Sequence, residues 1–285
     1  MNLASVVHDG QGYVASVDQG RVSLLRPGDL GSLLWEPDWA EEVRAAVPMG
    51  NVGWAEVTPL PVVPRPAKVM CIGLNYVRHI EEVGATRPDY PTVFAKYARA
   101  LIGDGAPIML PATSGRVDWE VELVVVVGRE VRNAGREESA AAIAGFTVGN
   151  DISARDLQNR TSQWLQGKTC DSTTPVGPWL TTVDVTGAEP DLAIRCEVDG
   201  TLRQDSRTSD LLFKPVDLVS FLSGIVTLEP GDLIFTGTPG GVGQGMKPPV
   251  FLEAGQTVVS SVEGIGRLVN QCQPEGKAGA AGRAW

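Results

Sequence analysis

Apolar residues recur along the chain in short runs, which turn-forming residues separate. The run from Val117 to Val127 is rich in valine and too short for a typical helix, so it predicts a buried strand. Similar strand signals occur at 12–17, 21–25, 68–72, 180–185, 192–198, 232–236 and 257–262. Helical patterns fit 40–46, a segment beginning near Val77, 137–144 and 215–222. Because strands outnumber these short helices, the pattern predicts an α+β fold with a mainly antiparallel sheet.

A proline-rich segment, 59–66, divides the pattern into two parts. Such a segment is typical of a connector between folded units. We therefore expect a small N-terminal domain at 1–62 and a catalytic domain at 63–273. The residues from 274 to 285 are rich in glycine and alanine, which predicts a disordered tail.

The composition is that of an ordinary globular protein, with 285 residues, 43% hydrophobic and 20% charged. The formal charge of -10 argues against a nucleic-acid partner, because phosphates would repel such a surface. The chain has no apolar run that could span a bilayer and no leader-like start, so we expect a cytoplasmic protein without a membrane partner. None of the cysteines forms a Cys-x-x-Cys pair, and we expect all of them to be reduced: Cys71, Cys170, Cys196 and Cys272.

Two carboxylates, Glu120 and Glu122, lie near the start of the valine-rich run. Side chains alternate along a strand, so these two share a face. Like charges beside an apolar core repel each other and lose hydration, and a bound cation offsets that cost best. All-oxygen ligation favours a hard ion, Mg²⁺ or Mn²⁺ or else Ca²⁺, over zinc. A solvated sheet face is the alternative for this pair taken alone.

Asp151 opens a second polar segment. If a helical turn begins at Asp151, then Arg155 and Gln158 project on the same side. That arrangement would direct one metal ligand, one guanidinium and one amide into a common pocket, and an arginine fork suits a substrate carboxylate. The competing interpretation is an N-capping aspartate with an exposed arginine.

His79 and Glu82 are three residues apart in a segment with a helical pattern, so their side chains can meet. A carboxylate beside an imidazole is a usable general base for water. A surface ion pair is the alternative for these two residues by themselves. With only two histidines, the chain excludes a histidine-rich zinc site.

Lys168 and Thr238 complete the set of polar candidates. Lys168 follows Gly167, which would let the backbone approach a ligand closely, and the lysine would bind an oxyanion or a substrate carboxylate. An unpaired surface lysine is the alternative. Thr238 lies in a glycine-rich loop, 236–243, that lacks the spacing of a P-loop or a dinucleotide fingerprint. Its N–H groups and the Thr238 hydroxyl could still hold a small anion.

Taken together, these segments resemble the fumarylacetoacetate hydrolase family, which includes acylpyruvate hydrolases and 2-hydroxyhepta-2,4-diene-1,7-dioate isomerases. The matching segments appear in family order: 72–76 with His79 and Glu82, 117–123, 149–158, 163–168, 175–179, 230–232, 236–239 and 263–266. No single motif is decisive, but the ordered set is specific and covers about residues 68 to 270.

The resemblance implies an α+β fold, a mixed β-sandwich roll with a small N-terminal α+β domain, and a homodimer. It implies a divalent ion held by Glu120, Glu122 and Asp151. It assigns His79 and Glu82 to water activation and Lys168 to substrate binding and oxyanion stabilisation. Four further residues match family positions that contact the substrate: Lys96, Arg155, Gln158 and Thr238.

One departure concerns the wall of the pocket. After Phe94-Ala95-Lys96 the family usually continues with proline and then serine or threonine, whereas this chain reads Tyr97-Ala98-Arg99. We therefore expect Tyr97 and Arg99 near the variable end of the substrate, with an outward orientation as the alternative.

These features predict a metal-dependent hydrolase that cleaves a carbon–carbon bond in a 2,4-dioxo acid of the acylpyruvate type through a metal-bound enolate. In this hypothesis Glu82 and His79 deprotonate the attacking water, and Lys168 stabilises the oxyanion. The alternatives at the same site are decarboxylation of an oxaloacetate-like acid and keto–enol isomerisation, because all of these reactions share the enolate. A catalytically silent ligand-binding protein is a further alternative. Retention of the His-x-x-Glu pair favours hydrolysis.

Overall fold

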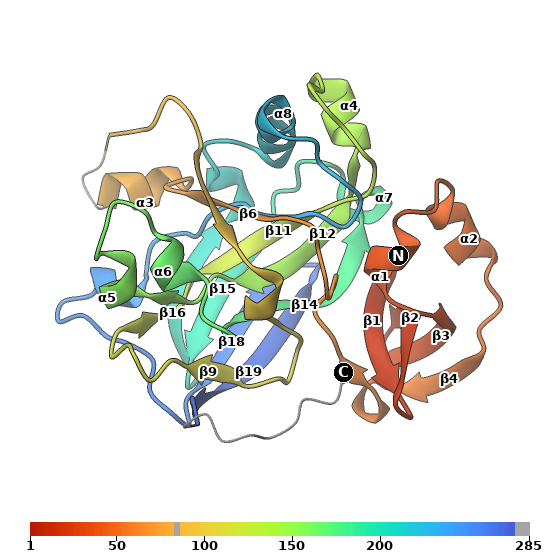
Figure 1. Cartoon of the computed structure of the whole chain (residues 1–285), viewed down its shortest axis with the longest axis horizontal. Coiled ribbons are helices and arrows are strands. Elements are labelled where there is room, and N and C mark those ends of the chain that lie inside the picture. Colours follow the sequence, from red (N-terminus) through yellow and green to blue (C-terminus); the bar gives the residue numbers. More distant parts are fainter. Residues whose placement is uncertain (83–85, 277–285) are drawn as a thin grey trace.

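Two β-sheets packed face to face form the body of the protein (Figure 1). The structure, a computed structural model, describes residues 1–82 and 86–276. The larger sheet contains β1 (Asn2–His8), β2 (Gln11–Asp18), β3 (Arg21–Pro27), β4 (Gly50–Gly53), β5 (Thr58–Pro59), β6 (Val69–Gly73), β7 (Thr92–Lys96), β8 (Leu101–Ile102), β11 (Val121–Val127), β12 (Ile143–Asn150), β14 (Thr174–Thr182) and β17 (Leu233–Phe235). Its main path runs β4-β3-β2-β1-β14-β12-β11-β17-β6-β7.

The smaller sheet has the order β16-β15-β18-β19-β9. It contains β9 (Ile108–Leu110), β15 (Ala193–Val198), β16 (Thr201–Arg207), β18 (Thr257–Val262) and β19 (Gly266–Pro274). A short ribbon pairs β10 (Val117–Asp118) with β13 (Ser153–Ala154).

The helices are short and lie around the sheets (Figure 1). They are α1 (Leu30–Leu33), α2 (Trp39–Ala45), α3 (Val77–Glu82), α4 (Arg136–Ala141), α5 (Arg155–Gln158), α6 (Leu165–Lys168), α7 (Val183–Thr186) and α8 (Pro215–Ile225), with 3-10 turns η1 (Trp54–Glu56), η2 (Ala98–Ala100), η3 (Thr208–Asp210) and η4 (Gly243–Gly245). Among the described residues, no helix combines the length and the apolar composition needed to cross a membrane.

Strand β11 explains the valine-rich run, because both of its faces are buried. Leu123 and Val125 pack into the core between the two sheets, together with residues of β15 and β19. Val124 and Val126 pack on the opposite face, beside Phe235 of β17 and the residues of α1. A strand covered on both faces needs apolar side chains at every position, not at alternate ones.

The predicted α+β class with a mainly antiparallel sheet is confirmed. In the described part of the chain, parallel pairing joins only β6 to β17, β8 to β14 and β9 to β19. The main domain and the N-terminal strands share one sheet, because Leu3 of β1 pairs with Leu180 of β14. Strand β1 gave no recognised strand signal in the sequence. Strand β19 extends to Pro274, and residues 277–285 of the expected tail lie outside the described residues.

Three predicted elements have different bounds in the structure. The strand expected at 117–127 is interrupted after Asp118, because the N–H of Trp119 donates to the Asp118 carboxylate and that of Glu120 donates to Asn150 Oδ1. The strand expected at 180–185 belongs to β14 and ends at Thr182, where α7 begins. The helix expected at 137–144 ends at Ala141, since the following apolar residues form β12 against β11.

Candidate active site

Antiparallel pairing of β11 and β12 brings the three predicted carboxylates together. Glu122 is opposite Gly149, and Val121 is opposite Asn150, so the start of β11 lies beside the end of β12. Glu120 precedes β11 and Asp151 follows β12, and the Asp151 N–H donates to the Glu120 carbonyl at 2.8 Å. The strand register therefore determines the proximity of residues that are about 30 positions apart in sequence.

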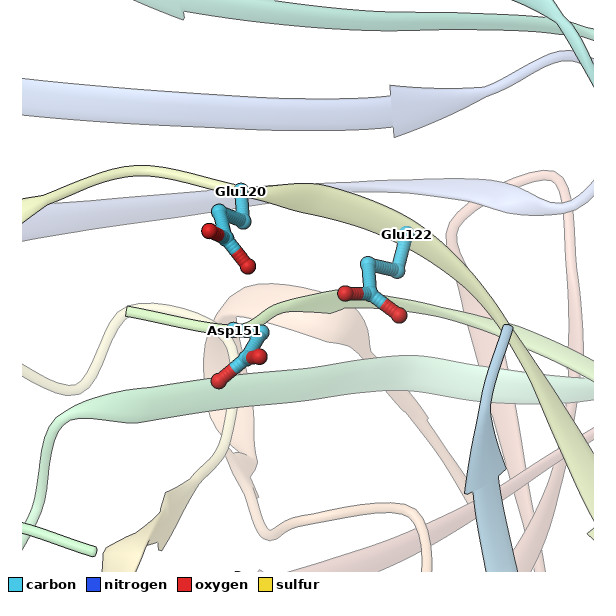
Figure 2. Close-up of side chains that lie close together, drawn as sticks. All are labelled: Glu120, Glu122 and Asp151. Atoms are coloured by element: carbon cyan, nitrogen blue, oxygen red, sulfur yellow. The ribbon is translucent and has the colours of Figure 1, made fainter. Parts of the chain in front are cut away.

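The carboxylates of Glu120, Glu122 and Asp151 converge at this point (Figure 2). One oxygen from each residue lies within 4.8 Å of the others, and all three side chains are buried. The alternative of a solvated sheet face is therefore wrong. A cluster of carboxylate oxygens without nitrogen or sulfur donors suits Mg²⁺, Mn²⁺ or Ca²⁺.

Two buried lysines balance part of this negative charge. Lys168 Nζ donates to Glu120 Oε2 at 2.8 Å and to Asp151 Oδ2 at 2.7 Å, and Lys96 Nζ donates to Asp151 Oδ1 at 2.5 Å. Burial opposes ionisation of Asp151, but the charges of Lys168 and Lys96 prevail and lower its pKa to about 2. Burial also lowers the pKa of Lys168, yet the charges of Asp151 and Glu120 outweigh that effect and raise it above the ordinary value. Lys168 is thus a buried, charged lysine, not an unpaired surface residue.

Glu122 has a different environment. Its Oε2 accepts the Gly237 N–H at 2.6 Å, and no ion pair in the described part of the chain joins Glu122 to a cation. Burial, followed by the charges of Asp151 and Glu120, raises its pKa well above the usual range. A buried carboxylate without a cationic partner, beside two others, fits the expected metal site. These three residues could hold a divalent ion.

Gly237 is needed at this contact for two reasons. Its φ is +102°, which favours glycine, and a Cβ there would lie 2.9 Å from Asn75 Cβ and 3.0 Å from the Ile72 carbonyl oxygen. The next residue, Thr238, donates its hydroxyl to the Val121 carbonyl at 2.9 Å and accepts from Gln204 Nε2 at 2.8 Å. The loop after β17 is therefore fixed against β11, with a backbone N–H directed at the carboxylates.

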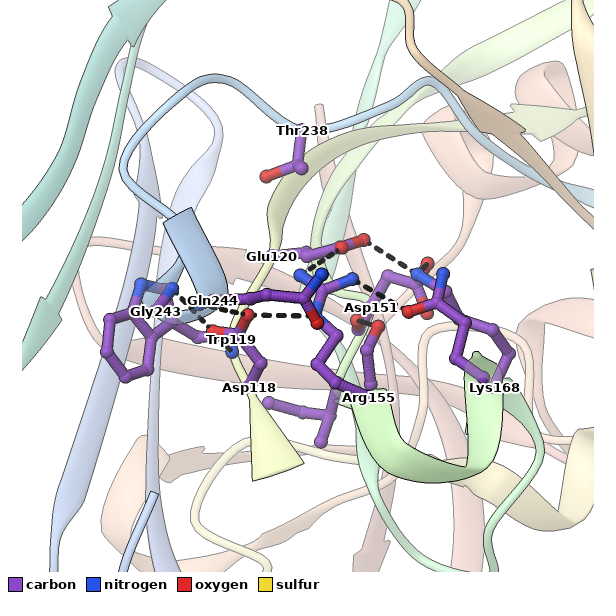
Figure 3. A network of polar contacts seen from close by, with 12 residues as sticks. Asp118, Trp119, Glu120, Asp151, Arg155, Lys168, Thr238, Gly243 and Gln244 are labelled. Atoms are coloured by element: carbon purple, nitrogen blue, oxygen red, sulfur yellow. Dashed lines mark hydrogen bonds and ion pairs between the residues drawn. The ribbon is translucent and has the colours of Figure 1, made fainter. Parts of the chain in front are cut away.

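Arg155 lies on the other side of Glu120 and is buried (Figure 3). Its NH2 group pairs with Glu120 Oε1 at 2.6 Å, its Nε donates to Asp118 Oδ2 at 2.8 Å, and its NH1 donates to Gln158 Oε1 at 3.0 Å. A guanidinium has five N–H groups, so two of them, one on NH1 and one on NH2, have no partner in these three contacts. The bond to Arg155 also fixes the Gln158 amide with its oxygen toward the arginine.

The helical turn expected from Asp151 is wrong, because α5 begins at Arg155 and its N-cap is Ala154. Arg155 nevertheless contacts Glu120 directly, Lys168 bridges Glu120 to Asp151, and Gln158 is bonded to Arg155. The competing interpretation, an exposed arginine behind a capping aspartate, does not fit a buried Arg155.

A cavity of about 420 Å³ opens onto these groups. Its polar lining includes Glu120, Glu122, Arg155, Gln158, Asn159, Lys168, Thr238 and Gln244. Its apolar wall consists of Ile72, Leu74, Phe94, Trp164 and Val242. The volume suits a small organic acid.

Phe94 and Trp164 form the aromatic part of this wall, with ring centroids 5.4 Å apart in an edge-to-face arrangement. The Lys168 ammonium lies 4.9 Å from the centroid of the Phe94 ring, which favours its charged form. The Trp164 ring fills the space that a side chain at residue 73 would occupy, because a Cβ on Gly73 would lie 2.5 Å from it.

His79 and Glu82 lie in α3, so the predicted helix is confirmed. Their side chains lie outside the described residues, and their predicted role in water activation stays a prediction.

Tyr97 and Arg99 do not line the cavity: Tyr97 is 56% exposed, and Arg99 is exposed and pairs with Asp171 at 2.7 Å. The structure supports the alternative, an outward orientation: Tyr97 follows the buried Lys96 at the end of β7, and Arg99 lies in the turn η2. Lys96 contacts Asp151 but does not line the cavity.

Gly167, which the sequence predicts to allow close approach of a ligand, instead allows two helices to pack closely. A Cβ there would lie 2.5 Å from the Ala154 carbonyl oxygen and 2.6 Å from the Gln158 nitrogen. Gly167 therefore allows α6 to pack against the start of α5, which places Lys168 at the carboxylates.

Sequence reasoning missed Asp118, Asn150, Gln204 and Gln244 as members of the site. Asp118 and Asn150 stood inside matching segments, whereas Gln204 and Gln244 carried no signal in the sequence. Asn150 Oδ1 accepts the Glu120 N–H at 2.8 Å, and Gln204 Oε1 accepts the Val121 N–H at 2.9 Å. These amides fix the backbone on either side of the carboxylates.

The fold and the carboxylate cluster together define a known class of protein. Residues 68–273 match the family model for the C-terminal domain of fumarylacetoacetate (FAA) hydrolase, and the chain belongs to this family. The predicted resemblance is confirmed.

Particular relatives include the mitochondrial oxaloacetate tautomerase Fahd2a of Rattus norvegicus. It is 44% identical over 218 residues, which cover 76% of this chain and 70% of the relative. Among solved structures, a putative HpcE protein from Mycobacterium smegmatis is 36% identical with a TM-score of 0.86, over 97% of this chain and 100% of that one. The fumarylacetoacetate hydrolase EaFAH from Exiguobacterium antarcticum is 31% identical with a TM-score of 0.85, over 96% of this chain and 100% of that one.

Proposed function

We propose that this protein is a divalent-metal-dependent enzyme that interconverts the keto and enol forms of an oxaloacetate-like 2-oxo dicarboxylic acid. The observation that carries the proposal is the buried carboxylate cluster, which faces a small cavity beside Lys168 and Arg155. Similarity to a relative named as an oxaloacetate tautomerase supports the choice of reaction.

The charge of the site supports an anionic substrate. Asp118, Glu120, Glu122 and Asp151 contribute four negative charges if all are ionised, and three buried cations face them: Lys96, Lys168 and Arg155. The cluster alone is therefore formally -1, and a divalent ion would bring it to +1. A positive, buried site attracts a carboxylate and disfavours a neutral ligand.

The side chains have distinct roles in this proposal. Glu120, Glu122 and Asp151 would hold the ion, which supplies a Lewis acid that stabilises negative charge on the 2-oxo oxygen of the substrate. The unused N–H groups of Arg155 bind a substrate carboxylate. Lys168 remains protonated at neutral pH and donates a hydrogen bond to the oxygen that gains charge when the proton of the neighbouring carbon passes to a water molecule in the cavity. Return of that proton to the oxygen gives the enol, and its return to the carbon gives the keto form. The apolar wall formed by Phe94 and Trp164 excludes water from that oxygen.

Hydrolysis of an acylpyruvate-like 2,4-dioxo acid is the second candidate function. Two observations favour it: the His79-x-x-Glu82 spacing in α3, and the similarity of the fold to a fumarylacetoacetate hydrolase. In this reaction the His79–Glu82 pair deprotonates the attacking water, while Lys168 and Arg155 keep the roles given above.

The decisive experiment compares products. Purified protein with Mg²⁺ is incubated with enol-oxaloacetate, and the loss of enol absorbance is followed together with total oxaloacetate, pyruvate and CO₂. We expect rapid loss of the enol signal with total oxaloacetate unchanged. Release of CO₂ and pyruvate would instead identify a decarboxylase, and cleavage of members of an acylpyruvate panel would identify a hydrolase.

Variants sharpen this test. Glu122→Gln keeps the size of the side chain but removes its charge, and it should abolish turnover and weaken Mg²⁺ binding, as should excess chelator. His79→Ala should lower hydrolysis by on the order of 10²-fold, the usual contribution of a positioned base. Full activity in excess chelator would refute metal dependence. A cytoplasmic homodimer stays a prediction from the sequence.

A further inference from the structure

Asp118 is a fully buried carboxylate beside the site, and Arg155 links it to Glu120 by pairing with both residues. Its Oδ1 accepts the N–H groups of Trp119 at 2.9 Å and Gly243 at 2.7 Å. Its Oδ2 accepts the N–H of Gln244 at 3.0 Å and Nε of Arg155 at 2.8 Å. Figure 3 shows this residue between the arginine and the loop that carries Gly243 and Gln244.

All four contacts of this carboxylate are with donors. A carboxylate offers about four acceptor positions, so Asp118 is saturated and has no capacity for a substrate or an ion. Only an ionised carboxylate can satisfy four donors at once, because an amide or a protonated acid would direct N–H or O–H groups at some of them. Asp118 is therefore suited to hold other groups in place and not to react.

The groups that Asp118 holds form two walls of the cavity. Arg155 contributes the guanidinium, whose plane is set by its bonds to Asp118, Glu120 and Gln158. Gln244 also lines the cavity, and its side-chain oxygen accepts from Asn159 Nδ2 at 3.5 Å, which joins the loop to the residue that follows α5. One carboxylate thus holds the arginine and this loop together.

We infer that Asp118 is a positioning residue for the anion subsite: it ties Arg155 to the Gly243–Gln244 backbone, so that the two N–H groups of the guanidinium without a partner in these contacts can bind a substrate carboxylate. The inference rests on the proposed function only in taking a small organic anion as the ligand. It extends that function to a residue that touches neither the substrate nor the metal.

The test uses Asp118→Asn in the full-length protein, with oxalate as a non-reacting probe and saturating Mg²⁺. Oxalate carries two adjacent carboxylates, so it mimics the carboxylate and 2-oxo oxygens of a 2-oxo acid. The asparagine amide must face two donors whichever way it is turned, so Arg155 or the loop loses its anchor. We expect oxalate affinity by calorimetry to fall about tenfold or more, the range for loss of a charge-assisted hydrogen bond. Mg²⁺ affinity should stay within about threefold of the parent, because Glu120, Glu122 and Asp151 are unchanged.

Two further measurements separate positioning from general structural damage. KM for oxaloacetate should rise by about tenfold or more while kcat changes by less than about threefold, the pattern expected when substrate binding is lost but the reacting groups remain. In an Arg155→Gln background the same asparagine substitution should have little additional effect on oxalate affinity, since Asp118 and the loop that it anchors act on oxalate by holding the arginine.

Asp232→Asn is the matched control. Asp232 is also fully buried and accepts the N–H groups of Lys68 at 2.9 Å and Glu229 at 2.8 Å, but it does not line the cavity. Its replacement should lower thermal stability without changing oxalate affinity. An equal loss of oxalate affinity in both variants would overturn the inference, as would additive effects of Asp118→Asn and Arg155→Gln.

The two proposals fail in different ways. If the parent protein does not tautomerise oxaloacetate but Asp118→Asn still weakens oxalate binding, the proposed reaction is wrong and the inference stands. If the parent is active and Asp118→Asn changes neither oxalate affinity nor KM, the inference is wrong. If Asp118→Asn does not fold, the test uses Asp118→Glu, which retains the negative charge but displaces it. An unchanged oxalate affinity of Asp118→Glu would overturn the inference. Failure of Asp118→Glu to fold would overturn it as well.

Discussion

Replacement of Lys168 by methionine should lower the Tm of the metal-free protein and abolish turnover. Addition of Mg²⁺ should raise the Tm of this variant by more than it raises the Tm of the parent. Lys168 Nζ contacts Glu120 Oε2 and Asp151 Oδ2 at 2.8 Å and 2.7 Å, and the lysine is fully enclosed. Methionine has a similar length but carries no charge. The substitution leaves one oxygen of each carboxylate buried without its cationic partner.

The size of the effect follows from this burial. Removal of one partner from a buried ion pair destabilises a protein by about 3–5 kcal/mol, because the remaining charge stays out of water. For a chain of this size, 1 kcal/mol corresponds to about 2–4 °C in Tm. We therefore expect the Tm of the metal-free variant to fall by roughly 6–20 °C.

Mg²⁺ should reverse part of this loss. Lys168 and a divalent ion would draw on the same carboxylate oxygens, so the lysine competes with the ion in the parent but not in the variant. An ion at a hundred times its Kd stabilises by about 2.7 kcal/mol, and tighter binding increases that gain. The increase in Tm on addition of Mg²⁺ should therefore be larger for Lys168→Met than for the parent, although turnover is lost.

The assay is thermal unfolding in chelator and in saturating Mg²⁺, with the Mg²⁺ Kd measured by calorimetry. Lys68→Met serves as a control, because Lys68 pairs with Glu229 and Asp232 away from the cavity. That control should show the same Mg²⁺ response as the parent. A Lys168→Met protein with the parent's Tm in chelator, or with no larger response to Mg²⁺ than Lys68→Met, would refute this reasoning.

Three further predictions concern single residues. Because burial and the charges of Asp151 and Glu120 raise the pKa of Glu122, Mg²⁺ must displace a proton when it binds, and Mg²⁺ affinity should fall by up to about tenfold per pH unit below that pKa. Calorimetry in two buffers of different ionisation enthalpy would detect the released proton. Mg²⁺ binding without proton release would contradict the prediction. Gly73→Ala would place a methyl group 2.5 Å from the Trp164 ring. We therefore expect the free energy of unfolding in urea to fall by about 1–3 kcal/mol and KM for oxaloacetate to rise. Unchanged values would show that the ring moves freely. Arg99→Ser should leave the ratio of kcat/KM values for neutral and acidic substrates unchanged, since Arg99 faces the surface. A changed ratio would show that Arg99 interacts with the substrate.

The sequence determined the fold class and most of the candidate residues, because those features depend on local patterns. A short, continuous, valine-rich run predicts a buried strand, and turn-forming residues indicate its ends. The order of the polar segments identified the family, and it named Glu120, Glu122, Asp151, Arg155 and Lys168. The structure brings these residues together, and all of them except Asp151 line one cavity.

Only the tertiary structure decided how these residues meet. Pairing of β11 with β12 places Asp151 beside Glu120, and the sequence did not specify the register of this pair. Arg99 lies in the turn η2 and pairs with Asp171, 72 positions away, at the surface. The role of Asp118 depends on the Gly243 N–H, which is 125 positions away. Local propensity fixes elements, whereas hydrogen bonds and ion pairs between distant segments fix the site, because a buried polar group must find its partner wherever the fold supplies one.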